Sequence, residues 1–190
     1  MAESITIKVN QMAPNFALID IFGKKINLNN YKGKKVLVGF FRHAGCPFCN
    51  VRVHNLQRHQ QAFEELGLRM IFFFESTSET LSKHKFHTDL NPIPLIADPE
   101  KVWYNQYGIE NSKLKSAISH ITSIFPTAIR AKLKGIPVHM MEGKESINTI
   151  PAEFLINENG IVKVVHYARG LNDRMRMETI LDFAKNKLND

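Results

Sequence analysis

The chain has 190 residues and a net charge of +7, with 44% hydrophobic and 23% charged residues. This composition is ordinary for a globular protein, and the length suits one domain with a well-buried core. The longest purely apolar run, residues 70–74, is too short to span a membrane, and the N-terminus is polar where a signal peptide would be basic and then apolar. We therefore expect a cytoplasmic protein with no membrane span.

The positive charge is concentrated in residues 1–60. This part has nine Lys or Arg side chains against two acidic ones, whereas the two kinds are equal in number in the rest of the chain. Such a surplus can attract an acidic partner or a nucleic acid. The basic residues are scattered singly and no nucleic-acid motif accompanies them, so we expect no nucleic-acid binding and a local effect on nearby thiols instead.

The elements predicted in chain order alternate between strands and helices. Residues 15–20 and 26–28 predict a small hairpin, and the continuous apolar run 36–41 predicts a central strand covered on both faces. A helix with an apolar stripe should follow and end at Gly67. The next expected elements are a buried strand at 68–74, a helix from 76 towards 87, a short strand at 94–97 and a helix ending near 107. This order predicts an α/β fold with a parallel core.

The last part of the chain departs from that alternation. Residues 110–149 have helical apolar spacing interrupted by Pro126, and we expect a helical insertion that packs over the core or across a homodimer. A basic amphipathic surface for a membrane or a partner is the alternative interpretation of this segment. Residues 151–156 and 161–165 flank an Asn-Gly turn and predict a hairpin, and residues 173–188 predict a final helix.

Both cysteines of the chain, Cys46 and Cys49, lie between the apolar strand 36–41 and the helix that follows it. They could form a redox pair, half of a metal site, or two buried core thiols. A structural zinc site usually needs two spaced pairs of Cys or His ligands, and no second pair has that spacing. We therefore expect no metal, and the position at a strand-to-helix junction favours a redox pair over chance core thiols.

The surroundings of Cys46 favour a reactive thiolate. Cys46 should lie at a helix N-terminus, where free N–H groups and the helix dipole stabilise an anion, and Pro47 fits the first helical turn. Arg42 and His43 are near in sequence, and residues 21–63 contain no acidic side chain. Each of these features lowers the pKa of a thiol.

Cys49 supplies the second half of a reaction. Residues three apart are neighbours on a helix, so Cys49 can attack a sulfenic acid or a mixed disulfide formed at Cys46. We assign Cys46 as the attacking thiolate and Cys49 as the resolving thiol, and expect Cys49 to be the less exposed. Pro151, which opens a late strand after Ile150, is a candidate cis-proline.

Taken together, these motifs resemble the redoxins of the AhpC/TSA group, in the peroxiredoxin-like branch of the thioredoxin superfamily. The matching stretches are residues 13–18 with 23–24 and 31–34, residues 38–49, residues 98–108, and residues 150–156 with Gly160. They cover nearly the whole chain apart from about 110–149. The resemblance implies a single thioredoxin-like domain over residues 1–190, with a central mixed sheet flanked by helices, an N-terminal hairpin, and thiols that face a cis-proline at 151.

The resemblance also implies an activity. Peroxiredoxins reduce hydroperoxides without a cofactor: a thiolate becomes a sulfenic acid, a second Cys resolves it, and a donor such as thioredoxin or a glutathione-like thiol recycles the disulfide. Their usual site has Thr or Ser three residues before the nucleophile, where this chain has His43, and an Arg near the start of the late strand, where it has residues 149–151. Arg42 or Arg169 could take the role of that Arg.

The sequence is also compatible with two other functions. The C-x-x-C pair with a cis-proline also resembles a thioredoxin-type oxidoreductase acting on protein disulfides. A redox-responsive binding module that uses the basic surface of residues 1–60 or the segment 110–149 is the non-enzymatic interpretation. His43 could stabilise the Cys46 thiolate, donate a proton to a leaving group, or only open the helix.

Overall fold

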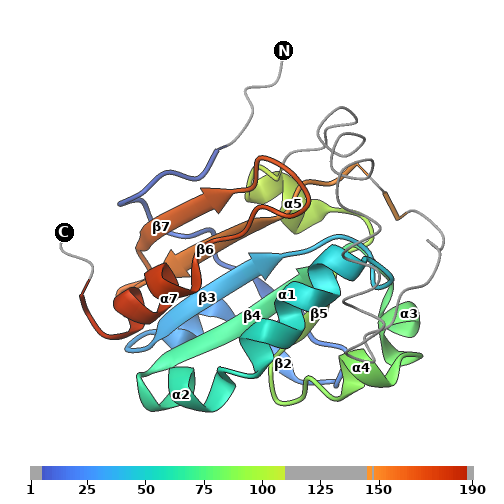
Figure 1. The fold of residues 1–190 in the computed structure, drawn as a ribbon, viewed down its shortest axis with the longest axis horizontal. Helices are drawn as coiled ribbons and strands as arrows, with labels where there is room; N and C mark the ends of the chain where they lie inside the picture. The colour runs from blue at the N-terminus through green and yellow to red at the C-terminus, as the bar shows by residue number, and fades with distance from the viewer. Residues whose placement is uncertain (1–5, 110–144, 147, 188–190) are drawn as a thin grey trace.

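A five-stranded mixed sheet forms the centre of the protein, in a computed structural model that describes residues 6–109, 145–146 and 148–187. Its strands lie in the order β5-β4-β3-β6-β7, with β3, β4 and β5 parallel and β6 and β7 antiparallel (Figure 1). The bounds are β3 (Lys35–Phe40), β4 (Leu68–Phe74), β5 (Leu95–Ala97), β6 (Ala152–Ile156) and β7 (Val162–Tyr167). The predicted mixed α/β architecture is therefore confirmed.

Strand β3 lies in the middle of the sheet and supplies side chains to both of its faces. Val36, Val38 and Phe40 belong to the core on one face, whereas Leu37 and Phe41 belong to the core on the other. All six residues of β3 are buried. The continuous apolar run in the sequence is explained by this double burial, as expected of a central strand covered on both faces.

Helices cover the face that receives Leu37 and Phe41. Helix α1 (Pro47–Gln57), helix α2 (Gln60–Glu65) and helix α7 (Met177–Ala184) pack on this face, and Figure 1 shows α1 and α7 in front of the strands. Helices α3 (Ser78–Ser82) and α4 (Lys85–Thr88) follow β4 along the chain. In the part of the chain that the structure describes, no helix is long and apolar enough to cross a membrane.

The opposite face is covered by the N-terminal hairpin and one short helix. The hairpin consists of β1 (Ala17–Ile19) and β2 (Lys25–Asn27) and runs into a 3-10 helix, η1 (Leu28–Tyr31). Helix α5 (Val102–Gln106) completes this layer, which contributes Phe16, Ile26 and Tyr104 to the core. Both predicted hairpins, β1-β2 and β6-β7, are confirmed.

Two predicted helices are each divided into two. The helix after the cysteines breaks at His59, whose ψ of 4° leaves helical geometry, and the chain resumes as α2. The apolar stripe survives the break, because Val53, Leu56 and Phe63 are all fully buried. The helix expected from 76 towards 87 is divided into α3 and α4 in the same way. The predicted insertion at 110–149 lies outside the described residues, apart from 145, 146, 148 and 149.

Candidate active site

Cys46 is the N-cap residue of α1, directly after the loop that leaves β3. Its backbone N–H donates to the His43 carbonyl at 3.0 Å, and its carbonyl accepts the Asn50 N–H at 3.0 Å. Pro47 occupies the start of the helix. As the N-cap residue, Cys46 has its sulfur at the positive end of the helix dipole. The sulfur makes no cap hydrogen bond with the backbone N–H groups of the first turn.

Arg42 contacts both thiols. Its Nη1 atom lies 3.5 Å from the Cys46 Sγ, and its backbone N–H donates to the Cys49 Sγ at 3.4 Å. The Arg42 side chain is only 1% exposed, so water screens its charge little. The residue expected to lie near the thiols from its sequence position is thus placed against them.

The two thiols have opposite pKa shifts. Burial raises the pKa of Cys46, but the hydrogen bond from Cys49 and the charges of Arg42 and Arg174 outweigh it and lower this pKa from 9.0 to about 6. Burial, the hydrogen bond with Cys46 and the negative charge on Cys46 raise the pKa of Cys49 well above 9.0. Near neutral pH, Cys46 is therefore a thiolate and Cys49 a protonated thiol that donates to it.

Both sulfurs are enclosed, which differs from the expected gradient of exposure. Cys46 and Cys49 are free thiols, and each has an exposed fraction of 0%. We expected Cys49 to be the less exposed of the two, but Cys46 is equally buried because the loop 42–46 and the first turn of α1 pack into the core on the face of the sheet that α1 covers. Both sulfurs are therefore shielded from solvent in the reduced protein.

Arg174, which sequence reasoning missed, is the second cation at the thiols. It lies in the loop between β7 and α7, and its Nη2 atom is 3.9 Å from the Cys49 Sγ. Arg169, the residue expected from the sequence, is exposed instead, and its backbone N–H donates to the Asp173 carboxylate at 2.8 Å. Arg174 lies 125 residues from Cys49 in the sequence, so proximity along the chain could not indicate it.

A buried ion pair fixes the loop that carries Arg174. Arg52 on α1 and Glu153 on β6 pair through two contacts, Nε to Oε1 at 2.6 Å and Nη2 to Oε2 at 3.0 Å. Met175 closes the arrangement, since its N–H donates to Glu153 at 2.8 Å and its carbonyl accepts from Arg52 at 2.9 Å. Helix α1, strand β6 and this loop are therefore held together at one buried point.

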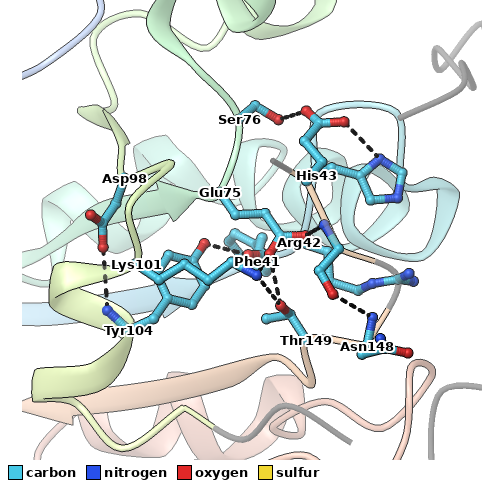
Figure 2. Close-up of polar contacts among 12 residues, drawn as sticks. Phe41, Arg42, His43, Glu75, Ser76, Asp98, Lys101, Tyr104, Asn148 and Thr149 are labelled. Atoms are coloured by element: carbon cyan, nitrogen blue, oxygen red, sulfur yellow. Dashed lines mark hydrogen bonds and ion pairs between the residues drawn. The ribbon is translucent and has the colours of Figure 1, made fainter. Parts of the chain in front are cut away.

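The contacts of His43 extend beyond the start of helix α1. Its Nδ1 atom lies 3.8 Å from an oxygen of Glu145, and the other oxygen of Glu145 accepts a hydrogen bond from the Ser76 hydroxyl (Figure 2). Ser76 in turn accepts the Ala44 N–H at 2.7 Å. The loop between β3 and α1 is thus tied to the end of β4 and to residue 145.

A second buried carboxylate, that of Glu75, supports the loop between β3 and α1. Glu75 accepts from Lys101 at 2.8 Å and from the Thr149 hydroxyl at 2.7 Å, and its own N–H donates to the Arg42 carbonyl at 3.3 Å (Figure 2). Tyr104 adds a hydrogen bond to the Phe41 carbonyl. Thr149, at the position where the resemblance implies an arginine, therefore serves Glu75 and not the thiols.

The prediction that Pro151 is a cis-proline was wrong. The cis bond among the described residues is Asn91–Pro92, and the Ile150–Pro151 bond is trans. Pro151 is a buried residue that opens β6, where its carbonyl accepts the Ala168 N–H at 3.0 Å and its missing N–H is not needed. The alternative based on a cis-proline beside the thiols loses that support.

The chemistry of the described residues is that of a thiol pair. Across residues 6–109, 145–146 and 148–187, no three His, Cys, Asp or Glu side chains gather as a metal ion would need. A thiolate of low pKa, a neighbouring thiol of high pKa and two guanidinium groups are present instead. This arrangement can donate two electrons and end as a disulfide between Cys46 and Cys49.

Comparisons with known proteins concern the family and the fold of the chain. A model of the AhpC/TSA family matches residues 9–165. The peroxiredoxin Bcp of Escherichia coli K12 is 28% identical over 107 residues, which cover 56% of this chain and 68% of that protein. Peroxidoxin BcpB from Mycobacterium tuberculosis has a TM-score of 0.63 at 16% identity and covers 96% of both chains. A thiol peroxidase from Chromobacterium violaceum has a TM-score of 0.65 at 12% identity, over 98% of this chain and 91% of that one. At these identities the two structures show the fold alone, which is the redoxin type that the sequence predicted.

Proposed function

Because the chain belongs to the AhpC/TSA family, we propose that it is a peroxiredoxin-like thiol peroxidase that reduces hydroperoxides through Cys46 and Cys49. The observation that carries the proposal is the Arg42 guanidinium against the Cys46 sulfur, at the N-terminus of α1. A relative named peroxiredoxin Bcp supports the same activity.

The first step is an attack of Cys46 on the peroxide. The thiolate attacks one peroxide oxygen, the O–O bond breaks, and the sulfur is oxidised to a sulfenic acid. The leaving oxygen takes up a proton and departs as water or an alcohol. Arg42 contributes in two ways, because its charge keeps Cys46 ionised and its Nη1 donor can stabilise negative charge on an oxygen next to the sulfur.

The second step is the resolution of the sulfenic acid by Cys49. The Cys49 sulfur attacks the Cys46 sulfur, an S–S bond forms, and hydroxide leaves and takes up the Cys49 proton to become water. An external thiol donor, of the thioredoxin or glutathione kind, then reduces the disulfide in two exchange steps. We place this cycle in the cytoplasm, where such donors keep thiols reduced.

One stopped-flow experiment tests the proposal. Reduced protein is mixed with hydrogen peroxide, and the loss of thiols is followed together with the fluorescence of Trp103. We expect a second-order rate constant far above that of free cysteine, loss of the reaction in Cys46→Ser, and a sulfenic acid that dimedone traps in Cys49→Ser. A rate constant no larger than that of free cysteine would overturn the proposal.

A matched assay addresses thiol–disulfide exchange on proteins. The same reduced sample is offered insulin with a small-molecule dithiol as the electron source. Since both sulfurs are fully buried and Pro151 is trans, we expect no turnover above background. Rapid insulin reduction with slow peroxide consumption would assign the chain to the thioredoxin-type activity instead.

A further inference from the structure

The Arg174 side chain contacts the sulfur of the resolving thiol, Cys49. Its Nη2 atom is 3.9 Å from the Cys49 Sγ, and its Nη1 atom donates to the Asp173 carbonyl at 2.6 Å. The Nε atom is buried and has no hydrogen-bond partner among the described residues. A buried donor without a partner carries a free-energy cost, and a negative charge arriving next to it would relieve that cost.

The buried ion pair between Arg52 and Glu153 fixes the position of Arg174 relative to Cys49. Arg52 lies three residues after Cys49 on α1, so both side chains project from neighbouring positions of one helix. Through Arg52 and Glu153, the backbone of Met175 is bonded on both its N–H and its carbonyl. The residue before it, Arg174, is therefore placed relative to the helix that carries Cys49.

The charge around Cys49 changes once Cys46 has reacted. In the reduced protein, burial raises the pKa of Cys49, and the hydrogen bond with Cys46 and the negative charge on Cys46 raise it further. A sulfenic acid at Cys46 is neutral, so the last two influences disappear and burial alone still opposes the thiolate. The Arg174 guanidinium and the Arg42 N–H remain beside the Cys49 sulfur, where both favour its thiolate.

We propose that Arg174 is a catalytic residue of the resolving step, and that Arg52 and Glu153 are positioning residues that hold it there. Arg174 stabilises the Cys49 thiolate while the S–S bond forms and the S–O bond of the sulfenic acid breaks, with water as the leaving product. Oxidation of Cys46 by the peroxide supplies the electron acceptor, so no further reactant is needed. The inference rests on the proposed peroxidase function.

The test separates the two chemical steps by their dependence on peroxide. The first phase of a stopped-flow trace, oxidation of Cys46, is second order, whereas the second phase, disulfide formation, does not depend on peroxide concentration. In Arg174→Met we expect the second phase to slow by about tenfold or more, the loss typical of one charge-assisted contact, and the first phase to change less than about threefold. The rate of the second phase in Arg174→Lys should lie between the rates in Arg174→Met and in the wild type.

The matched control is Arg176→Met, two residues further on. Arg176 is exposed and pairs with Glu178 at 3.2 Å, so both phases should keep their wild-type rates. A second readout follows sulfinic acid by mass spectrometry at high peroxide, because a longer-lived sulfenic acid is oxidised further. Arg174→Met should accumulate more sulfinic acid than either the wild type or Arg176→Met.

Each outcome decides a different claim. An unchanged second phase in Arg174→Met, with a fast first phase present, overturns the role of Arg174 and leaves the peroxidase function standing. A wild-type protein without a fast first phase overturns the peroxidase function itself. These two failures are distinguishable in the same traces.

The positioning residues are tested by a double-mutant cycle. Glu153→Gln and the milder Arg52→Lys, each checked by circular dichroism for folding, should slow the second phase, and either change added to Arg174→Met should slow it no further. Independent, additive slowing of the second phase would show that the ion pair acts by another route. If Glu153→Gln does not fold, the cycle with Arg52→Lys gives the decision.

Discussion

The two faces of the central sheet differ in the side chains that pack on them. On the face covered by the β1-β2 hairpin and α5, aromatic rings meet one another, with Phe40 stacked on Phe73 at 4.6 Å between centroids and in contact with Tyr107 at 4.8 Å. On the face covered by α1 and α7, the core contains both thiols and abuts the Arg52–Glu153 ion pair.

The difference concerns how stability and reactivity arise within one sheet. Buried aromatic rings contribute apolar area and ring-to-ring contacts, which stabilise the folded state. Buried charges are expensive to desolvate, and their pairing often no more than offsets that expense. The face covered by α1 and α7 has ring contacts of its own, such as Phe41 with Phe72 at 5.3 Å between centroids. We infer that this face also accepts a stability penalty for its buried charges, which in return alter the pKa values of two thiols.

The largest effect is expected from a change on the face covered by the β1-β2 hairpin and α5. Phe16 is fully buried and contacts the Phe73 ring at 5.0 Å, so Phe16→Ala should lower the free energy of unfolding by about 3–5 kcal/mol. Urea denaturation measures the loss, and Ile19→Ala, at a position that is 63% exposed, is the control. The rate of peroxide oxidation of the folded protein should stay within about twofold; a parallel loss of rate would show that the faces are coupled.

A second change removes the cation from the attacking thiol. Arg42→Met keeps an unbranched apolar stem in the buried site but removes a charge that lowers the pKa of Cys46, so this pKa rises. At pH 7 the rate of the first oxidation phase should fall by at least about tenfold, since each pKa unit changes the thiolate population tenfold once the pKa exceeds the pH. The exposed Arg58→Met is the control on α1, and an unchanged rate would contradict the assignment of Arg42.

The pH profile sharpens the contrast between the two thiols. With a Cys46 pKa of about 6, the thiolate absorbance at 240 nm should appear with a midpoint near pH 6, and the first oxidation phase should slow as the pH falls below it. Cys49→Ala removes the hydrogen bond that lowers this pKa, so the midpoint should move upwards. A rise of about one unit would halve the thiolate at pH 7. A midpoint that does not move would show that Cys49 does not support the Cys46 charge.

The smallest effect is expected away from both faces. Lys83 and Glu79 form an ion pair at 3.0 Å on α3, with side chains 55% and 79% exposed. Lys83→Ala should change the free energy of unfolding by no more than about 0.5 kcal/mol and leave both oxidation phases unchanged. A loss of more than about 1 kcal/mol would show that α3 contributes to the folded core more than its exposure indicates.

The features that the sequence predicted are those set by local patterns. The apolar run of β3, the Asn-Gly turn before β7 and the start of α1 at Pro47 depend on residues within a few positions of one another. The placement of Cys46 at a helix N-terminus follows from the same local reasoning. The division of the helix at His59 was not predicted, because the apolar stripe continues across it and only tertiary packing sets the break.

The features that the sequence did not predict join distant parts of the chain. Arg174 reaches Cys49 across 125 positions, and Glu153 meets Arg52 across 101. Many exposed arginines and glutamates have the same local pattern, so nothing in the sequence distinguishes these two. Pro151 was misjudged for a related reason, since whether an X-Pro bond is cis or trans depends on what packs against it.

The long span of the Arg52–Glu153 contact also sets an order of assembly during synthesis. A chain grows from its N-terminus, so Cys46, Cys49 and Arg42 leave the ribosome long before Glu153 and Arg174 exist. Contacts of such separation form late because the intervening loop must first be ordered. The nascent protein therefore contains both thiols before it contains Arg174, the second cation beside them. Arg174 reaches Cys49 only when the last third of the chain has docked.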